Sequence, residues 1–139
     1  MYQNILLAAD GSQNSIRAAK EALKIAQINA ETLVTIIFII DMEKAKTDVL
    51  HSSSIESLYM ERRRKLVPIE ELFNEHQVRY KVEIIHGSPG PEIIKFANTQ
   101  NVDLVVIGSR GLNSLQEMVL GSVSHKVMKR VQCPAMLVK

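Results

Sequence analysis

Short runs of aliphatic residues recur along the chain and predict β-strands. The ranges are 4–9, 33–40, 80–85, 102–107 and 134–138. Four of these runs show little alternation between apolar and polar residues, which is typical of strands covered on both faces of a sheet. The run from Tyr80 to Ile85 alternates instead, with Lys81 and Glu83 between apolar residues. It therefore predicts an edge or half-exposed strand.

Apolar residues spaced by three and four positions predict helices between the strands. The helical ranges are 12–28, 55–76, 89–99 and 121–131. Ser12 is the expected N-cap of the first helix, and Ser88 caps the third with Pro89 at its first position. Pro68 lies inside the second range, so we expect that helix to be disturbed there.

Strands that alternate with helices predict an α/β fold with a parallel sheet and helices on both faces. In such folds ligands bind beyond the carboxyl ends of the strands, where the strand order reverses. Residues 41–54 are polar without a clear period, so we expect a loop at that end of the sheet. No linker divides the chain, which predicts one domain over residues 1–139.

Composition excludes several classes of protein. Apolar residues make up 46% of the chain and charged residues 23%, which is ordinary for a globular protein. A net charge of +2 is too balanced to argue for nucleic acid or a membrane surface. The basic run 62–65 has glutamates nearby on the same predicted helix, which explains it by intrahelical pairing. No apolar run approaches the roughly 20 residues of a membrane span, and the N-terminus does not resemble a secretory signal.

The single cysteine, Cys133, excludes an internal disulfide and suits a reducing compartment. Together with the lack of a signal or span, it predicts a cytoplasmic protein. Cys133 precedes a terminal strand, which favours a buried structural thiol over a nucleophile. The four histidines lack metal-ligand spacing, and neither a Gly-x-Ser-x-Gly elbow nor a carboxylate pair is present. We therefore expect no catalytic residues.

The segment after the fourth strand carries the most informative pattern. Gly108 ends the strand, Gly111 follows in the loop, and Gly121 with Ser122 begins the last helix. A strand, a glycine-rich loop and a helix N-terminus together favour an anion such as phosphate. The spacing Gly-x2-Gly-x9-Gly-Ser is neither the Walker form nor the dinucleotide form. Arg110 and Lys126 either add positive charge near a phosphate or are simply solvated.

Asp10-Gly11-Ser12 ends the first strand and has two interpretations. If the first and fourth strands are neighbours, Asp10 faces the glycine loop and can bind a ribose hydroxyl or a divalent cation. The plainer interpretation is that these residues turn the chain and cap the first helix. Beside the glycine loop, we favour the functional interpretation.

These motifs, together with the segments 86–89 and 133–138, resemble the universal stress protein family over essentially the whole chain. The resemblance implies a three-layer α/β/α sandwich, Rossmann-like, with a five-stranded parallel sheet of order 3-2-1-4-5. It implies ATP or another adenine nucleotide, with Mg²⁺ or Mn²⁺ carried on the phosphates near Asp10. Ile39 would meet the adenine through its backbone. The remaining implied nucleotide-binding residues are Gly108, Arg110, Gly111, Gly121, Ser122, Val123 and Ser124.

The resemblance further implies a homodimer formed through the last strand, with no nucleic-acid or membrane partner. The leading hypothesis is thus an ATP-binding protein with a regulatory role in stress responses. Two alternatives stay open: a slow ATPase or nucleotide hydrolase in which Asp10 positions water, and a dimerisation module that does not use nucleotide.

Overall fold

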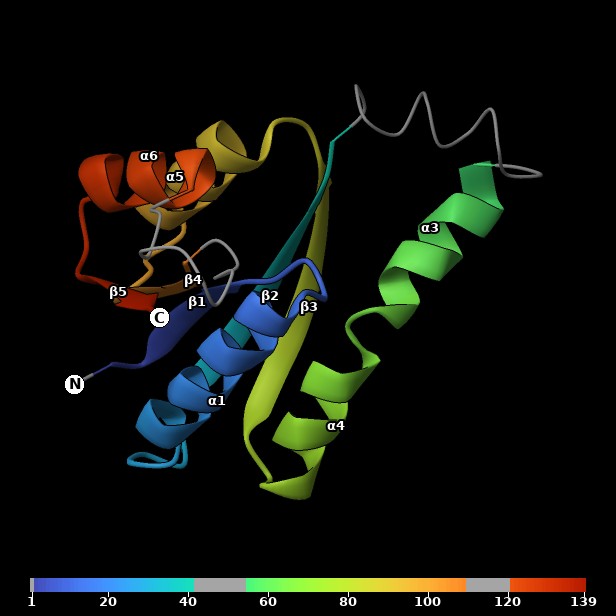
Figure 1. The fold of residues 1–139 in the computed structure, drawn as a ribbon. Coiled ribbons are helices and arrows are strands. Elements are labelled where there is room, and N and C mark those ends of the chain that lie inside the picture. Colours follow the sequence, from blue (N-terminus) through green and yellow to red (C-terminus); the bar gives the residue numbers. More distant parts are fainter. Residues whose placement is uncertain (1, 42–54, 110–120) are drawn as a thin grey trace.

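The computed structural model describes residues 2–41, 55–109 and 121–139. They form a parallel five-stranded sheet of order β3-β2-β1-β4-β5, with helices on both faces (Figure 1). The strands are β1 (Asn4–Ala8), β2 (Leu33–Ile40), β3 (Arg79–His86), β4 (Leu104–Gly108) and β5 (Ala135–Val138). The helices are α1 (Gln13–Ala26), α3 (Ile55–Arg64), α4 (Val67–Glu75), α5 (Pro89–Thr99) and α6 (Ser122–Arg130). The predicted α/β fold and strand order are confirmed.

The strand order reverses at β1, which lies at the centre of the sheet. Ile5 of β1 is aligned with Val34 of β2 on one side and with Leu104 of β4 on the other. Asp103 stabilises the pairing of β1 with β4, because its Oδ2 accepts hydrogen bonds from the N–H groups of Gln3 and Asn4 at 2.9 and 2.8 Å. The one polar residue in the predicted fourth strand therefore ties the start of β1 to β4.

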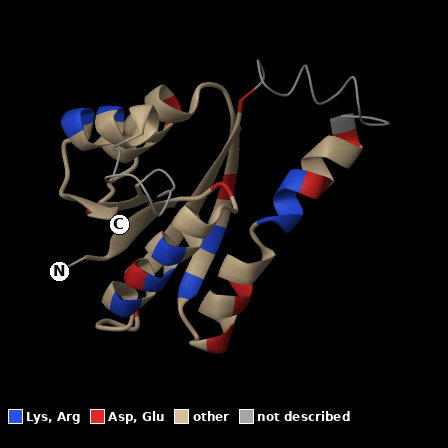
Figure 2. Cartoon of the chain, viewed as in Figure 1, with Lys and Arg blue, Asp and Glu red and all other residues tan. Residues whose placement is uncertain are grey.

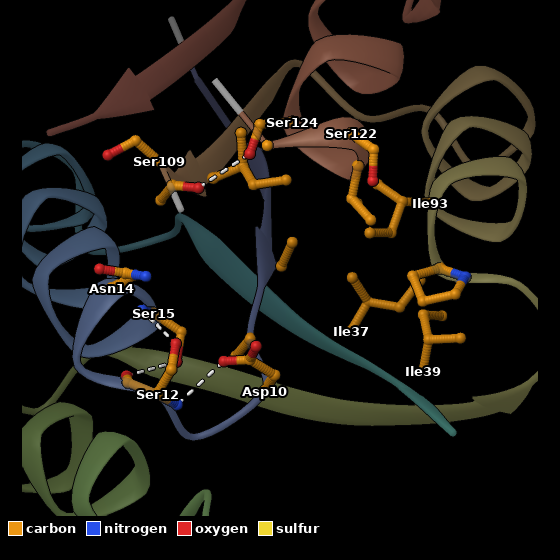
Figure 3. Close-up of a pocket in the computed structure, with 17 residues that line it drawn as sticks. Asp10, Ser12, Asn14, Ser15, Ile37, Ile39, Ile93, Ser109, Ser122 and Ser124 are labelled. Atoms are coloured by element: carbon orange, nitrogen blue, oxygen red, sulfur yellow. Dashed lines mark hydrogen bonds between the residues drawn. The ribbon is translucent and has the colours of Figure 1, made fainter. Parts of the chain in front are cut away.

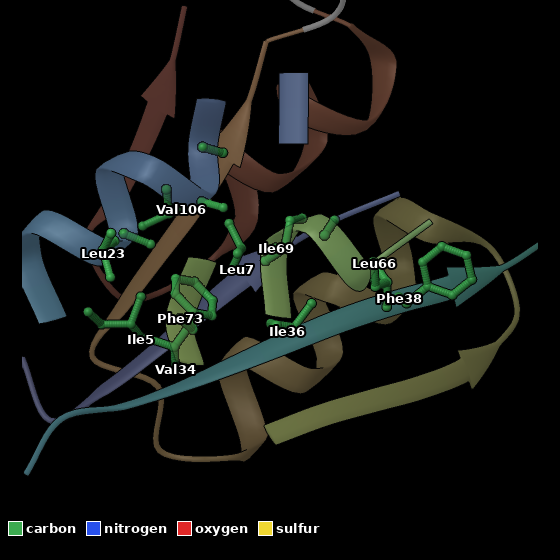
Figure 4. Close-up of a cluster of buried hydrophobic side chains, with 14 of the residues drawn as sticks. Ile5, Leu7, Leu23, Val34, Ile36, Phe38, Leu66, Ile69, Phe73 and Val106 are labelled. Atoms are coloured by element: carbon green, nitrogen blue, oxygen red, sulfur yellow. The ribbon is translucent and has the colours of Figure 1, made fainter. Parts of the chain in front are cut away.

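Two apolar clusters hold the helices to the sheet. The larger joins α1, α3 and α4 to one face, and its buried members include Leu7, Leu23, Ile36, Leu66, Ile69, Phe73 and Val106 (Figure 4). The smaller joins α5 and α6 to the other face through Leu6, Ile37, Ile93, Ala97, Val105 and Val127. Both faces of β1 are thus covered, as its unbroken aliphatic sequence predicts.

The two edge strands differ in how well the sequence predicted them. The half-exposed edge expected for Tyr80–Ile85 is confirmed by β3, where Arg79, Lys81 and His86 are exposed. The expectation that 134–138 is covered on both faces is wrong, because all four residues of β5 are only half-buried. With β4 as its sole neighbour within the described residues, β5 forms the opposite edge of the sheet.

The helix boundaries follow local chemistry. Ser12 caps α1 as expected, its Oγ accepting from the N–H of Ser15 at 3.3 Å. Ser88 holds the N-cap position of α5 without a side-chain hydrogen bond, and Pro89 is the first helical residue. The predicted helix over 55–76 divides into α3 and α4 at residues 65 and 66. Pro68 has no N–H, and its ring crowds the carbonyl of Arg64 four residues earlier, so the chain cannot continue as one helix.

Charges of both signs are spread over the described surface (Figure 2). Basic residues at the end of α3 lie beside acidic residues of α4, where Arg63 donates to both carboxylate oxygens of Glu70 at 3.0 and 2.7 Å. Arg63 of the basic run therefore pairs across the helix break, where a pairing within one helix was expected. Among the described residues, no helix is long and apolar enough to cross a membrane.

Candidate functional site

A cavity of about 330 Å³ opens at the carboxyl ends of the central strands (Figure 3). It lies where the strand order reverses between β1 and β4, and the first turns of α1, α5 and α6 border it. Its lining residues are Ala8, Ala9, Asp10, Ser12, Asn14, Ser15, Ile37, Ile39, Pro89, Ile93, Ile107, Gly108, Ser109, Gly121, Ser122, Val123 and Ser124. Ligands bind at this position in open α/β sheets.

One wall of the cavity is apolar. Ile37 and Ile39 of β2 and Ile93 of α5 lie together in Figure 3, and Ile107 of β4 continues the surface. Ile37 and Ile107 belong to the smaller apolar cluster, so the packing of α5 and α6 fixes their side chains. This wall suits a flat ring that has little charge.

The facing wall is polar and comes from the β1–α1 turn and the start of α1. Asp10 Oδ1 accepts from the N–H of Ser12 at 2.9 Å. Ser15 Oγ donates to the carbonyl of Ser12 at 2.9 Å. These bonds hold the turn in one conformation, so Asp10, Ser12 and Ser15 line the cavity from fixed positions. The turn-and-cap interpretation of Asp10-Gly11-Ser12 is confirmed, and Asp10 and Ser12 also border the cavity.

The start of α6 supplies the third side. Ser124 Oγ donates to the carbonyl of Gly108 at 3.0 Å, which ties the first turn of α6 to the end of β4. The N–H groups of a first helical turn have no acceptor within the helix, and the helix dipole makes this end positive. Gly121 has φ −64° and ψ 160°, a conformation open to any residue. Backbone geometry therefore does not explain the glycine at this position.

Packing explains why residue 108 is a glycine, and the sequence alone did not reveal this. A Cβ added there would lie 2.5 Å from the carbonyl oxygen of Asn14 in α1. Since only a residue without a side chain allows this approach, Gly108 lets the start of α1 pack onto the end of β4. The glycine thus shapes the cavity by bringing two of its walls together.

Ser109 follows directly and is fully buried at the cavity wall. Its N–H donates to the carbonyl of Val138 at 2.8 Å, which continues the pairing with β5. Its Oγ has no hydrogen-bond partner among the residues that the structure describes. A buried hydroxyl of this kind is costly unless it gains a partner.

The cavity brings together most of the predicted site residues. Those that line it are Asp10, Ile39, Gly108, Gly121, Ser122, Val123 and Ser124. Arg110 and Gly111 lie outside the described residues. Lys126 does not line the cavity; it is exposed, and its side chain lies over Gly90 of α5. The solvated interpretation of Lys126 is thus the one that the described structure favours.

Sequence reasoning missed several lining residues. Asn14, Ser15, Ile37, Pro89 and Ile93 were not among the predicted site residues, although all five border the cavity. The sequence predicts Pro89 only as the first residue of a helix. Ile37 lies within β2, and the other four belong to the first two turns of α1 and α5, the helices that follow β1 and β3.

Titratable groups in the described part of the chain form no metal site of their own. No three histidine, cysteine, aspartate or glutamate residues within it are grouped to hold an ion. Cys133 is half-buried, where a buried thiol was expected. This partial burial raises the pKa of the Cys133 thiol, which disfavours the reactive thiolate. Asp10 is the one carboxylate among the described lining residues.

A search against protein-family models matches residues 1–139 to Usp, the universal stress protein family. The chain belongs to the universal stress protein family. Universal stress protein MJ0531 of Methanocaldococcus jannaschii is 33% identical over 143 residues, covering 100% of this chain and 83% of the relative. The predicted family membership is confirmed.

Solved structures of similar proteins agree with this assignment. MJ0577 of the same organism superposes with a TM-score of 0.83 at 29% identity, covering 100% of this chain and 96% of the other. A universal stress protein family member from Arabidopsis thaliana, solved with AMP bound, has a TM-score of 0.71 at 20% identity. That comparison covers 99% of this chain and 91% of the plant protein, and it shows that the two share the fold.

Proposed function

We propose that this universal stress protein binds ATP, or another adenine nucleotide, in the cavity at the ends of β1 and β4. The observation that carries the proposal is the pairing of an apolar wall with a helix N-terminus across one cavity. Its volume of about 330 Å³ lies within the range of small-molecule sites. The plant relative solved with AMP supports the choice of an adenine nucleotide for this fold.

In the proposed complex the adenine lies against Ile37, Ile39 and Ile93, where apolar side chains replace water on the faces of the ring. The phosphates lie at the start of α6, where Gly121 and Ser122 offer backbone N–H groups and a hydroxyl. Arg110 and Gly111 are proposed to complete the phosphate site. Val123 and Ser124 belong to the same first turn.

A divalent cation, Mg²⁺ or Mn²⁺, is proposed to bind with the nucleotide. The described residues fit an ion that the phosphates carry, because they offer one carboxylate and no complete ligand set. Asp10 Oδ1 already accepts from Ser12 N–H, and Asp10 lines the same cavity. The ion would neutralise phosphate charge, and Asp10 would hold it near the ribose.

We propose that the protein holds nucleotide and acts through partners, as a cytoplasmic regulator in stress responses. Hydrolysis would need a group that positions water, and among the described lining residues only Asp10 is a carboxylate. Asp10 also accepts a hydrogen bond from Ser12 N–H, which stabilises the β1–α1 turn. The regulatory hypothesis is therefore preferred to the slow hydrolase. A dimerisation module that does not bind nucleotide would leave the cavity unexplained.

Calorimetric titration with MgATP tests the proposal. Wild-type protein is expected to show saturable binding, and Gly121→Ala should weaken it about tenfold or more, because a methyl group would occupy the phosphate's place. Gly90→Ala is the matched control, because this glycine also lies at the start of a helix and its added Cβ would meet only the flexible Lys126 side chain, at 3.3 Å or more. A wild type without saturable binding would overturn the proposed function.

A further inference from the structure

The turn that borders the cavity also contacts the break between α3 and α4. Gly11 lies between Asp10 and Ser12 and has φ +82°, a left-handed conformation that favours glycine. A Cβ added to Gly11 would lie 2.4 Å from Cβ of Lys65 and 3.0 Å from its carbonyl oxygen. The backbone of Lys65 therefore rests directly on the turn. We call Lys65 and Leu66, the two residues between α3 and α4, the junction.

The junction is anchored on its other sides. Leu66 is fully buried in the larger apolar cluster. Arg63 and Glu70 pair across the break through two hydrogen bonds, and this pairing raises the pKa of Arg63. The N–H groups of Lys65 and Leu66 donate three residues back, to Arg62 and Arg63, at 3.2 and 3.1 Å. The junction is thus a compact turn seated against Gly11.

Few of the side chains that the structure describes in α3 are buried. Leu58 is its one buried side chain among those described, whereas Tyr59 and Met60 are 40% and 57% exposed. In Figure 1 α4 lies along β3, while α3 continues beyond it. A helix with few buried contacts opens at lower free energy than the core. Lys65 directly follows Arg64, the last residue of α3, so the junction is the point at which opening of α3 would reach Gly11.

We propose that nucleotide occupancy of the cavity and seating of the junction on Gly11 are coupled, so that bound nucleotide holds the junction closed. The inference rests on the proposed function. Asp10 and Ser12 line the cavity, and a ligand that contacts them requires the turn to be ordered. Because coupling is reciprocal, any event that lifts α3 weakens nucleotide binding by the same factor. None of the described residues that line the cavity belongs to α3 or α4, so the effect would pass through Gly11.

Hydrogen–deuterium exchange of the full chain tests this coupling. The amides to follow are those of Lys65, Leu66, Ile69 and Glu70, all hydrogen-bonded at the junction. If nucleotide binds only the seated state, MgATP at ten times its Kd should slow their exchange about tenfold. The amides of β3 exchange through opening of the sheet, and MgATP should slow their exchange less.

Gly11→Ala tests the contact from the cavity side. In the nucleotide-free protein its added Cβ would displace Lys65, so exchange at the junction should become about fivefold faster or more. Gly87→Ala is the matched control, since Gly87 also has a positive φ, of +151°, and its added Cβ would meet Glu92 rather than the junction. It should leave junction exchange as in the wild type.

The outcomes separate the two proposals. Slower junction exchange with MgATP and faster exchange in Gly11→Ala support the coupling. Calorimetric binding without slower junction exchange, or with equal slowing throughout the sheet, overturns the coupling and leaves the proposed function standing. So does a Gly11→Ala protein whose junction exchanges at the wild-type rate. Absence of MgATP binding by the wild type overturns the proposed function, and the nucleotide coupling with it.

Discussion

Gly108 connects the packing of α1 to the shape of the cavity. The carbonyl oxygen of Asn14 lies where a Cβ of residue 108 would be, at 2.5 Å. A side chain there forces the backbone of α1 away from β4, and α1 carries one wall of the cavity. The requirement for glycine at this position therefore exists before any ligand binds.

Gly108→Ala is expected to destabilise the nucleotide-free protein by about 1–3 kcal/mol, the usual cost of overpacking. Chemical denaturation measures this loss. Gly90→Ala serves as the control, because its added Cβ would meet only the Lys126 side chain, with Cδ at 3.3 Å and Cβ at 3.7 Å, and a flexible side chain can relieve the closer contact. Unchanged stability in Gly108→Ala would contradict the packing role and would leave ligand binding as the explanation for this glycine.

Asp103 acts between elements, because it joins the start of β1 to the residue that precedes β4. One carboxylate oxygen accepts two backbone N–H groups, from Gln3 and Asn4. Asp103→Ala leaves both groups without this partner and should lower the free energy of unfolding by about 1–3 kcal/mol. Asp103→Asn keeps an acceptor oxygen and should lose less. Equal losses in equilibrium denaturation would show that the acceptor is unimportant.

Interactions between residues close in sequence predicted where helices begin and end better than they predicted how deeply a strand is buried. The cap at Ser12, the start at Pro89 and the break near Pro68 follow from groups a few residues apart, and all three are confirmed. Whether β5 is covered depends on how many strands lie beside it, which its own sequence does not encode. The aliphatic run from Ala135 to Val138 therefore predicted a strand correctly and its burial wrongly.

The candidate site was predicted in part for the same reason. Residues at strand ends and in the glycine motif could be named because position after a strand is visible in sequence. Asn14 and Ile93 border the cavity only because α1 packs on Gly108 and α5 packs against α6. Such lining residues depend on contacts between distant segments, which periodicity does not specify.

The two edges of the sheet differ in how well they are protected against pairing with another chain. Charged residues Arg79, Lys81 and Glu83 interrupt β3, which discourages pairing with another chain. β5 is Ala-Met-Leu-Val without a charge. On the side of β4, Val105 N–H donates to the carbonyl of Pro134 at 3.0 Å, and Ser109 N–H donates to the carbonyl of Val138 at 2.8 Å. By alternation, the N–H and C=O groups of Ala135 and Leu137 point to the open edge.

We therefore expect a homodimer through β5. Sedimentation velocity should show a dimer for the wild type and a dissociation constant about tenfold weaker for Ala135→Pro, which removes an outward N–H while an edge strand tolerates proline. The β4–β5 pairing should survive this change, so thermal stability of the protomer is the control. A wild type that sediments as a monomer at high micromolar concentration would contradict the dimer.

The pairing of β1 with β4 also has a consequence during protein synthesis. Ile5 is aligned with Leu104, so the centre of the sheet closes only after about a hundred residues have left the ribosome. Lining residues extend from Ala8 to Ser124, and a nascent chain lacks one side of the cavity until nearly the whole sequence has emerged. A ligand at this site would therefore bind finished molecules and not truncated ones, and would protect only complete chains from degradation.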